Sequence, residues 1–396
     1  MVVLTDEQNA RLTEVGPGTP GGELLRRYWQ PVGASAEVRR RGVIAVRVLG
    51  EDLVLFASEG AGFGLVQRRC PHRSASLAYG IPDENGLRCA YHGWYFNPEG
   101  RCIEQPYDDL VGNGTYKERI AIAAYPVREL GGLLWAYFGP APAPELPRWD
   151  ILVEEGLSRE IGFTELPCNW LQCMENSLDP VHFEWLHAQL SNYLARRRGE
   201  PPVMTPRRHL KIEFDLFEFG IFKRRLLEGD PETSDDWTVG HPILFPNTLA
   251  VGTTFQLRVP IDDTHTLHFN YVTRPLAEGE AAQVEVPLVA VPAVHENGEP
   301  VLESIIGQDM MAWVTQGPVA PRELENLARS DRGVVLYRRM LVENIERVER
   351  GEDPLGVIRD PARNEPMITL AREHNHLASM GYRGAPVTKQ LVATEP

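Results

Sequence analysis

The sequence is poor in cysteine, has no long apolar run and contains fewer basic than acidic residues. Five cysteines among 396 residues are too few for a disulfide framework. No run of about 18 apolar residues is present, and the opening MVVLTDEQNA lacks the basic and apolar regions of a signal peptide. We therefore expect no membrane association and a cytoplasmic location. The net charge of −15 argues against a nucleic-acid partner, because phosphate backbones select basic surfaces.

The composition that is present, 43% hydrophobic and 24% charged, is close to that of globular proteins and predicts neither disorder nor a fibrous repeat. The length allows one to three domains, and we expect two. In residues 6–29, the segment VGPGTPGG interrupts helix-like stretches, which indicates a docking arm. From Val43 to Gly139, short β-rich runs alternate with glycine-containing turns. This pattern is typical of a small antiparallel β domain.

A proline-rich stretch, PAPAPELPRWD at residues 140–150, predicts an extended connection. We place the domain boundary there, which gives domains of residues 1–145 and 146–396. The second domain is predicted to contain helices and strand-like runs in the order helix, strands, helices, which indicates an α+β fold with an antiparallel sheet flanked by helices. The expected helices are 170–187, 305–313 and 330–350, and the expected strand regions are 209–217, 219–227, 248–259 and 266–274.

The β-rich part contains two short motifs, Cys70-Pro-His72 and Cys89-Ala-Tyr-His92, each with one thiolate and one imidazole ligand. A single buried cysteine or histidine usually has no metal role, but two matching pairs change that expectation. Iron–sulfur clusters are usually held by four thiolates, whereas in Rieske centres two histidines replace two cysteines on one iron. Tetrahedral zinc is the chemical alternative, although zinc fingers place their two cysteines first and their two histidines second.

The second part contains CNWLQCMENSLDPVHFEWLH, which has the arrangement N-x2-D-x2-H-x4-H at Asn176, Asp179, His182 and His187. Steps of three place the first three residues near one helical face. His187 would lie about 140° from His182 around an ideal helix, so one ion can bind both only where the turn is distorted, and Pro180 gives a local reason for distortion. Two histidines and a carboxylate are the ligands of non-haem Fe(II) oxygenases. The alternative is that these four residues are solvated residues of a helix with no metal role.

Through these motifs, the sequence resembles the Rieske non-haem iron oxygenases, and within them the oxygenase (alpha) subunits of the phthalate dioxygenase-like group. The likeness also covers VGPGTPGGELLRRYWQPV near the start and QDMMAWVTQGPVAPRELENLARSDRGVVLYRRML near the end. It implies an N-terminal Rieske antiparallel β domain and a C-terminal helix-grip catalytic domain. It also implies that Cys70 and Cys89 bind one iron of a [2Fe-2S] cluster, while His72 and His92 bind the other.

The resemblance further implies roles for the second motif. His182 and His187 would hold a mononuclear Fe(II), with Asp309 of SIIGQDMMAWVTQGP as the third ligand. Asp179 would lie between a cluster-binding histidine of a neighbouring subunit and an iron-binding histidine, and Asn176 would be a pocket residue. The expected assembly is a homotrimer or a dimer of trimers.

The activity that this resemblance implies is hydroxylation or O-demethylation of a carboxylated or methoxylated aromatic compound. Dioxygen and electrons from NADH would be used, and a flavin or iron–sulfur reductase or a ferredoxin would deliver the electrons. The stretch FGIFKRRLLEGDPETSDDWTVGHPILFPN is similar to the corresponding part of dehydrodivanillate-type O-demethylases. It contains Lys223, Arg224 and Arg225, of which strand alternation sends one or two inward, where an arginine would suit a substrate carboxylate. A solvated basic edge stays the alternative. For the whole chain the alternative is a Rieske electron-transfer protein without its own oxygenation site.

Overall fold

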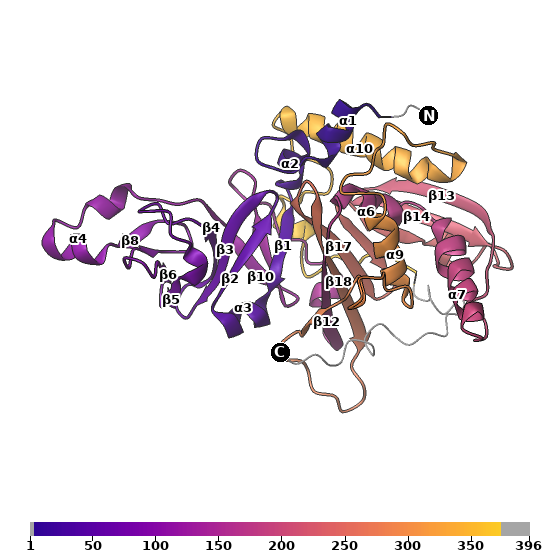
Figure 1. The fold of residues 1–396 in the computed structure, drawn as a ribbon, viewed down its shortest axis with the longest axis horizontal. Coiled ribbons are helices and arrows are strands. Elements are labelled where there is room, and N and C mark those ends of the chain that lie inside the picture. Colours follow the sequence, from indigo (N-terminus) through magenta and orange to yellow (C-terminus); the bar gives the residue numbers. More distant parts are fainter. Residues whose placement is uncertain (1–3, 374–396) are drawn as a thin grey trace.

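The computed structural model describes residues 4–373, which form an elongated molecule with small sheets at one end and a large sheet at the other (Figure 1). The small sheets are antiparallel and come from the first part of the chain. The first comprises β1 (Trp29–Ala34), β11 (Leu133–Tyr137) and β10 (Val127–Leu130); the second, β2 (Val43–Val48), β3 (Glu51–Ser58), β4 (Gly62–Gln67) and β9 (Ala124–Tyr125); the third, β5 (Ile81–Asp83), β6 (Gly86–Arg88), β7 (Tyr95–Phe96) and β8 (Cys102–Glu104).

The turn between β2 and β3 joins this part to the large sheet. Leu49 and Gly50 both have positive φ, 50° and 77°, as a two-residue hairpin turn of type I′ requires. Their N–H groups donate hydrogen bonds to the carbonyl oxygens of Pro260 and Ile261 at the end of a strand of the large sheet. The β-rich character expected for residues 43–139 is therefore confirmed, and its first hairpin contacts the second part directly.

The large sheet has eight strands in the order β13-β14-β15-β16-β17-β18-β12-β19. All pairs are antiparallel except β12 with β19, so the expected antiparallel sheet is mixed at one edge. The strands expected at 209–217 and 219–227 are confirmed, whereas the run 248–259 is two strands separated by a turn at Gly252. The strands are β12 (Leu157–Leu166), β13 (His209–Phe217), β14 (Gly220–Leu227), β15 (His241–Leu244), β16 (Thr248–Val251), β17 (Thr254–Asp262), β18 (His265–Pro275) and β19 (Leu288–Ala290).

The helices near 305–313 and 330–350 are confirmed, but the prediction of one helix over 170–187 is wrong. The chain forms α6 (Trp170–Ser177), a turn, and then a π-helix, η3 (Phe183–Leu190), that continues into α7 (Ser191–Arg197). The other helices are α1 (Asp6–Thr13), α2 (Pro20–Leu25), α3 (Ser35–Arg41), α4 (Pro106–Val111), α5 (Asp150–Val153), α8 (Asp235–Thr238), α9 (Ile305–Val314) and α10 (Arg332–Glu349), with short 3-10 turns between them. Among the described residues, no helix is both long and apolar enough to cross a membrane.

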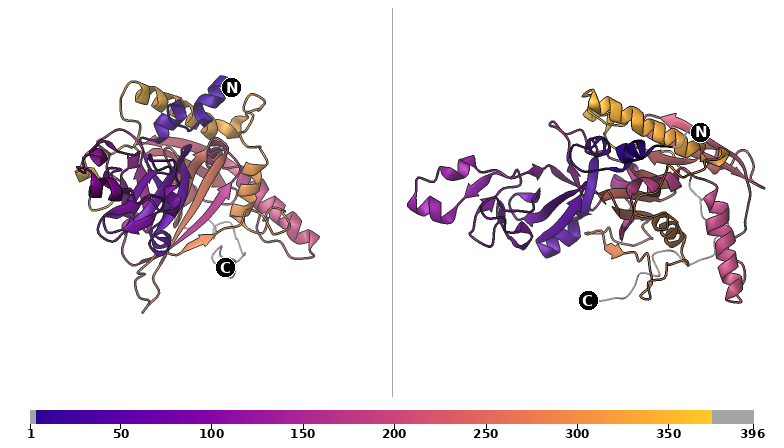
Figure 2. Two further views of the ribbon diagram at one scale, coloured as in Figure 1. Left: turned by 60° about the vertical axis from the view of Figure 1, so that its left-hand side comes forward. Right: turned by 45° about the horizontal axis from the view of Figure 1, so that its top comes forward.

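The opening arm packs on the far end of the chain. α1 and α2 lie beside α10, which crosses one end of the large sheet (Figures 1 and 2). Arg11 forms an ion pair of 2.7 Å with Glu349, and the Tyr28 hydroxyl donates to the carbonyl oxygen of Leu355. Residues 140–148, where an extended connection was expected, contain neither helix nor strand.

The strand register assigns side chains to the two faces of the large sheet, because directly paired residues of antiparallel strands point to the same side. One face contacts α6, η3 and α9. The paired residues on this inner face include Lys223 with His241, Ile243 with Leu249, Gln256 with Asn270, and Arg258 with His268. The opposite face carries Phe255 and Tyr271, and the Tyr271 hydroxyl donates to Gly131 of the first part. Any group held by α6, η3 or α9 therefore faces a polar patch of the sheet.

Candidate metal centres

The two cysteine–histidine motifs occupy two loops with the same backbone hydrogen bonds. In each loop the cysteine N–H donates to the carbonyl oxygen five residues on, and the cysteine carbonyl accepts from the N–H four residues on. The residue at that fourth position has a positive φ, 59° for Ser74 and 74° for Gly93. A Cβ at Gly93 would lie 2.9 Å from the ring of Pro106, so glycine is required there for space as well as conformation.

The ligand side chains of the two loops divide into an inner and an outer pair. Cys70 and Cys89 are buried, whereas His72 and His92 are exposed with ring centroids 4.5 Å apart. Burial raises the pKa of Cys70 to about 11, and Cys89 adds to the increase, so the Cys70 thiol becomes a thiolate only when a cation compensates it. In the described part of the chain these four side chains do not form a group within reach of one ion. Two buried thiols beside two exposed imidazoles match the two ligand pairs of a two-iron Rieske cluster.

The second motif is folded around an interrupted helix. α6 ends at Ser177 because Pro180 cannot continue it and disfavours helical backbone at Asp179. The Asp179 carboxylate accepts a hydrogen bond from the Val181 N–H, and the chain then enters η3. A π-helix has i to i+5 hydrogen bonds, which matches the five-residue step from His182 to His187. The distortion expected at Pro180 is confirmed.

The interruption brings three possible ligands together. His182, His187 and Asp309 each offer one ligand atom, and these atoms lie within 4.8 Å of one another. Asp309 Oδ1 is 3.2 Å from His187 Nε2 and 3.7 Å from His182 Nε2. Asp309 is 6% exposed, yet among residues 4–373 no donor gives its Oδ1 a hydrogen bond of good geometry. A buried carboxylate oxygen without a donor calls for a cation, so these residues fit a divalent metal ion.

Gln308 is a functional residue that the sequence did not indicate. Its side-chain nitrogen donates to Ser191 Oγ at 2.7 Å and to the carbonyl oxygen of Leu302 at 2.8 Å. Its Oε1 therefore faces His187 Nδ1, 2.9 Å away, as the acceptor. The proton is then on Nδ1, and Nε2 keeps its lone pair for a metal. No local sequence signal marks this role, because the contact joins residues 121 positions apart in the chain.

Charge interactions favour the ionised forms of Asp309 and His187. Burial alone would raise the pKa of Asp309, but His187 and His182 lower it overall. Burial likewise would lower the pKa of His187, and Asp309 and Gln308 raise it overall. A metal ion would replace the proton on His187 Nε2 without leaving Asp309 uncompensated.

The other two predicted site residues lie at the edge of this group. Asp179 Oδ2 is 3.6 Å from His182 Nδ1, on the opposite side of the ring from Asp309. Burial would raise the pKa of Asp179, but His182 lowers it overall. Asn176 is half-buried in the last turn of α6, and its carbonyl oxygen accepts from the Asp179 N–H. Asp179 can thus orient His182, while the side chain of Asn176 contacts none of the three ligands through a hydrogen bond in the described residues.

The three basic residues of β14 alternate across the sheet. Lys223 and Arg225 lie on the inner face and are 5% and 1% exposed, whereas Arg224 points to the other face and pairs with Asp215. Arg225 lies 4.7 Å above the ring of Phe183, which is 5.0 Å from the His187 ring. The alternative of a solvated basic edge is therefore wrong for Lys223 and Arg225.

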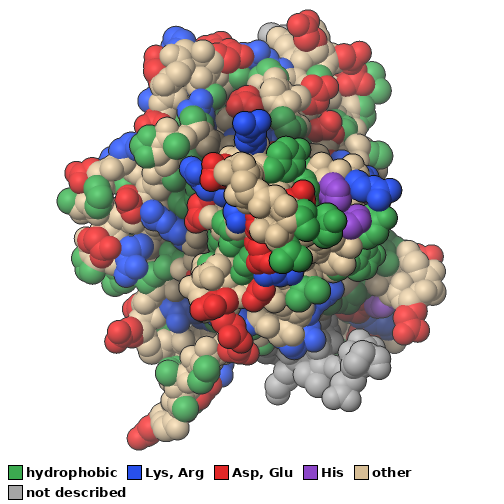
Figure 3. All heavy atoms as spheres, turned by 90° about the vertical axis from the view of Figure 1, so that its left-hand side faces the viewer, with side chains coloured by type: hydrophobic (Ala, Val, Ile, Leu, Met, Phe, Trp, Pro, Cys, Tyr) green, Lys and Arg blue, Asp and Glu red, His purple; other side chains and the backbone are tan. Residues whose placement is uncertain are grey.

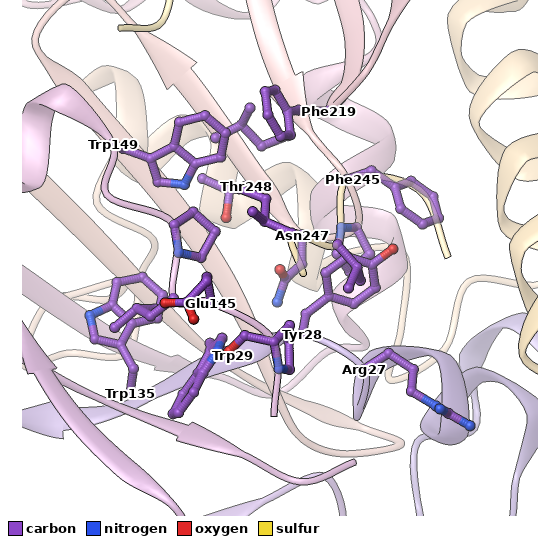
Figure 4. A pocket seen from close by; sticks show the side chains of 18 of the residues that line it. Arg27, Tyr28, Trp29, Trp135, Glu145, Trp149, Phe219, Phe245, Asn247 and Thr248 are labelled. Atoms are coloured by element: carbon purple, nitrogen blue, oxygen red, sulfur yellow. Dashed lines mark hydrogen bonds between the residues drawn. The ribbon is translucent and has the colours of Figure 1, made fainter. Parts of the chain in front are cut away.

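A separate pocket lies on the opposite face of the large sheet (Figure 4). Aromatic side chains of both parts of the chain line it, among them Trp29, Trp135, Trp149 and Phe219. None of the candidate metal ligands borders this pocket, so it is separate from both centres.

The paired loops and the separate two-histidine, one-carboxylate group define the class of Rieske non-haem iron oxygenases. The Rieske [2Fe-2S] domain family matches residues 28–117, and the family described as LigXa C-terminal domain like matches residues 298–370. The chain is 45% identical to the 5,5'-dehydrodivanillate O-demethylase oxygenase subunit of Sphingobium sp. (strain NBRC 103272 / SYK-6), over 94% of this chain and 88% of that protein. The chain belongs to this family as an oxygenase subunit.

Two further comparisons agree. The phthalate 4,5-dioxygenase oxygenase subunit of Pseudomonas putida is 29% identical over 89% of each chain. The fold is similar to that of the terminal oxygenase of carbazole 1,9a-dioxygenase from Novosphingobium sp. KA1, with a TM-score of 0.59 and 20% identity over 84% of this chain and 93% of that chain. The resemblance to phthalate dioxygenase-like oxygenases is confirmed, and the interpretation as an electron carrier without a catalytic part is not supported.

Proposed function

We propose that this oxygenase subunit has two metal centres, one in each of two domains at residues 1–145 and 146–396. The cluster ligands are Cys70, His72, Cys89 and His92, and the ligands of a mononuclear Fe(II) are His182, His187 and Asp309. The observation that carries the proposal is the convergence of the last three side chains in a chain that also has the Rieske loops. A cluster held there would supply electrons, and an iron with open positions would provide the site for dioxygen activation.

The protein's own residues orient and enclose this second centre. Gln308 holds the Nδ1 proton of His187, and Asp179 holds the ring of His182 from the outer side. Both arrangements leave the Nε2 atoms directed toward Asp309. Asn176, at the end of α6, is the proposed pocket residue.

The proposed reaction is hydroxylation or O-demethylation of a carboxylated or methoxylated aromatic compound. Two relatives support this substrate class, since one is named for O-demethylation of dehydrodivanillate and the other for dioxygenation of phthalate. Oxygenation of a methoxy carbon gives a hemiacetal, which collapses to the phenol and formaldehyde. The electrons come from NADH through a reductase or ferredoxin, which agrees with a cytoplasmic location.

We also propose a homotrimer or a dimer of trimers in which one subunit's cluster serves the next subunit's iron. The cluster loops lie at one end of the molecule, and η3 and α7 lie toward the other (Figure 1). At the cluster end, histidine side chains reach the surface beside hydrophobic ones (Figure 3). Tyr79, Tyr107 and Leu110 of this end are 79%, 73% and 80% exposed. Trp185, three residues beyond His182, is 63% exposed and offers an apolar contact at the iron end.

The test is turnover of methoxylated and carboxylated aromatic compounds with NADH and a Rieske reductase. We expect substrate-dependent oxygen uptake, with formaldehyde released when a methoxy group is attacked. Oxygen uptake that no aromatic compound stimulates would contradict the proposed substrate class.

A further inference from the structure

Lys223 is a buried cation without an ion-pair or hydrogen-bond partner in the described part of the chain. It is only 5% exposed. Its neighbours on β14 are both paired, since Arg225 Nε lies 3.2 Å from Asp236 Oδ2 and Arg224 pairs with Asp215. An unpaired buried charge is costly and is retained mainly where function needs it.

The position of Lys223 connects it to the candidate iron site. In the register of the sheet it pairs with His241 on the inner face, two residues from the arginine that packs on Phe183. Its charge interacts with the carboxylates of Asp179 and Asp309. The register therefore places the Lys223 side chain on the face of the sheet that packs against η3, which carries His187.

The carboxylates around Lys223 either have other partners or are protonated. Asp309 is directed at the two histidines, Asp179 accepts from Val181, and Asp236 lies 3.2 Å from Arg225 and 3.1 Å from His241. Glu373 also interacts with Lys223, but burial and then Asp236 raise the pKa of Glu373 to about 8, so it is mostly protonated at neutral pH. Burial and then Arg225 lower the pKa of Lys223 to about 8. A bound anion would relieve both effects at Lys223.

We propose that Lys223 binds the carboxylate of the aromatic substrate and thereby sets a preference for aromatic acids over neutral aromatics. This inference rests on the proposed function and narrows its substrate class. A carboxylate is ionised at neutral pH, whereas a phenol, with a pKa of about 10, is not. Arg225 is the poorer candidate, because Asp236 and the ring of Phe183 already hold its guanidinium.

The test compares 3-methoxybenzoate with 3-methoxybenzamide, which differ in charge but little in shape. Turnover gives KM and kcat, and calorimetry gives Kd without turnover. In the wild type we expect the acid to have a KM and Kd roughly 10- to 100-fold below those of the amide, as a charge-assisted hydrogen bond would give. In Lys223→Met this ratio should fall to near one, because only the values for the acid rise.

Arg224→Met is the matched control, since it removes a positive charge from the same strand on the opposite face. It should keep the wild-type ratio. Lys223→Met should also melt no lower than the wild type, because it removes an unpaired buried charge, whereas a structural role for Lys223 would lower Tm. A preserved ratio in Lys223→Met, or an equal loss for acid and amide, would overturn the proposal.

The same measurements distinguish a failure of the proposed function from a failure of the proposed role of Lys223. A wild type that oxygenates both compounds without preferring the acid contradicts the role of Lys223 and leaves the function standing. A wild type that oxygenates neither compound but binds the acid through Lys223 contradicts the function and supports the role. A wild type that binds neither compound contradicts the role of Lys223.

Discussion

Two adjacent residues of α9 act on the same histidine in different ways. Asp309 offers a carboxylate oxygen to the space that His187 Nε2 also faces, while Gln308 accepts the proton of Nδ1 on the other side of the ring. His187 is 1% exposed and Gln308 is 2% exposed, so water does not substitute for this contact. The orientation of the ligand therefore depends on one amide.

Gln308→Leu removes the acceptor for His187 and should weaken iron binding about 10- to 100-fold, as loss of such a supporting contact does at other metal sites. Gln308→Glu keeps an acceptor oxygen and should retain most of the affinity. Competition with an iron chelator measures both variants. Equal iron affinity in Gln308→Leu and the wild type would show that the amide does not orient the ligand.

His72→Cys replaces a neutral imidazole by a thiolate at the cluster. The added negative charge should lower the midpoint potential toward the value of about −400 mV that is typical of plant-type four-thiolate clusters. The exchange also removes the ring on which Trp94 stacks, with ring centroids 4.5 Å apart. A redox titration measures the change, and an unchanged midpoint would contradict a Rieske centre.

At the scale of elements, the sequence predicted those strands and motifs that depend on residues close together in the chain. β13 alternates apolar and charged residues, β14 has apolar residues at both ends of a basic stretch, and both were expected at nearly their true bounds. Both cysteine–histidine loops and the His182–His187 spacing are short motifs, which is why the candidate site could be named from the sequence. Asp309 needed the resemblance, because more than a hundred residues separate it from His187.

Other elements depend on partners far along the chain. β12 pairs with β18 on one side and with β19 on the other. It contains the charged residues Arg159 and Glu160 and the glycine Gly162, so its sequence did not indicate a strand paired on both sides. β15 has only four residues and includes Pro242, which is rare inside sheets. The π-helix could not be told from an α-helix by periodicity over eight residues. Gln308 was missed because its role appears only when α9 meets η3.

The ion pairs of Glu175 hold α6 against the C-terminal helix. Glu175 lies 2.8 Å from Arg322 and 2.6 Å from Arg338, and Arg322 is only 1% exposed. Glu175→Gln should cost about 3–5 kcal/mol, because it leaves the buried Arg322 guanidinium without a counter-charge, whereas Arg338 keeps its ion pair with Glu325. Glu343→Gln on the exposed side of α10 is the control and should cost at most about 1 kcal/mol. Chemical denaturation measures the stability of both variants. Equal denaturation midpoints for Glu175→Gln and Glu343→Gln would contradict the role of Glu175.

The same contact predicts a pH dependence. Burial would raise the pKa of Glu175, but Arg322 and Arg338 lower it overall. A carboxyl group whose pKa is lower in the folded state stabilises the protein above its unfolded pKa, about 4.3 for Glu. That stability is lost as the pH falls through the folded pKa. The difference between wild type and Glu175→Gln should therefore shrink below about pH 4.

At the scale of the whole molecule, the two proposed centres lie toward opposite ends of one chain (Figure 1). Electron transfer between chains predicts that defects in different centres complement each other. Cys89→Ala removes a cluster ligand and His182→Ala an iron ligand, so each variant should be inactive alone. Co-expressed mixed trimers should regain part of the activity, because some interfaces join an intact cluster to an intact iron. Verified mixed trimers that are inactive, with both metals in the expected amounts, would contradict the route between subunits.

The central claim is that this one chain holds a [2Fe-2S] cluster and a separate mononuclear iron. The most direct test is the ratio of iron to acid-labile sulfide in the purified protein, measured for the wild type and for Asp309→Ala. The account predicts about three irons and two sulfides per chain in the wild type. In Asp309→Ala it predicts about two irons and two sulfides, with the visible spectrum of the cluster retained and activity lost. A wild type with equal iron and sulfide, or an Asp309→Ala variant with the full iron content, would contradict it.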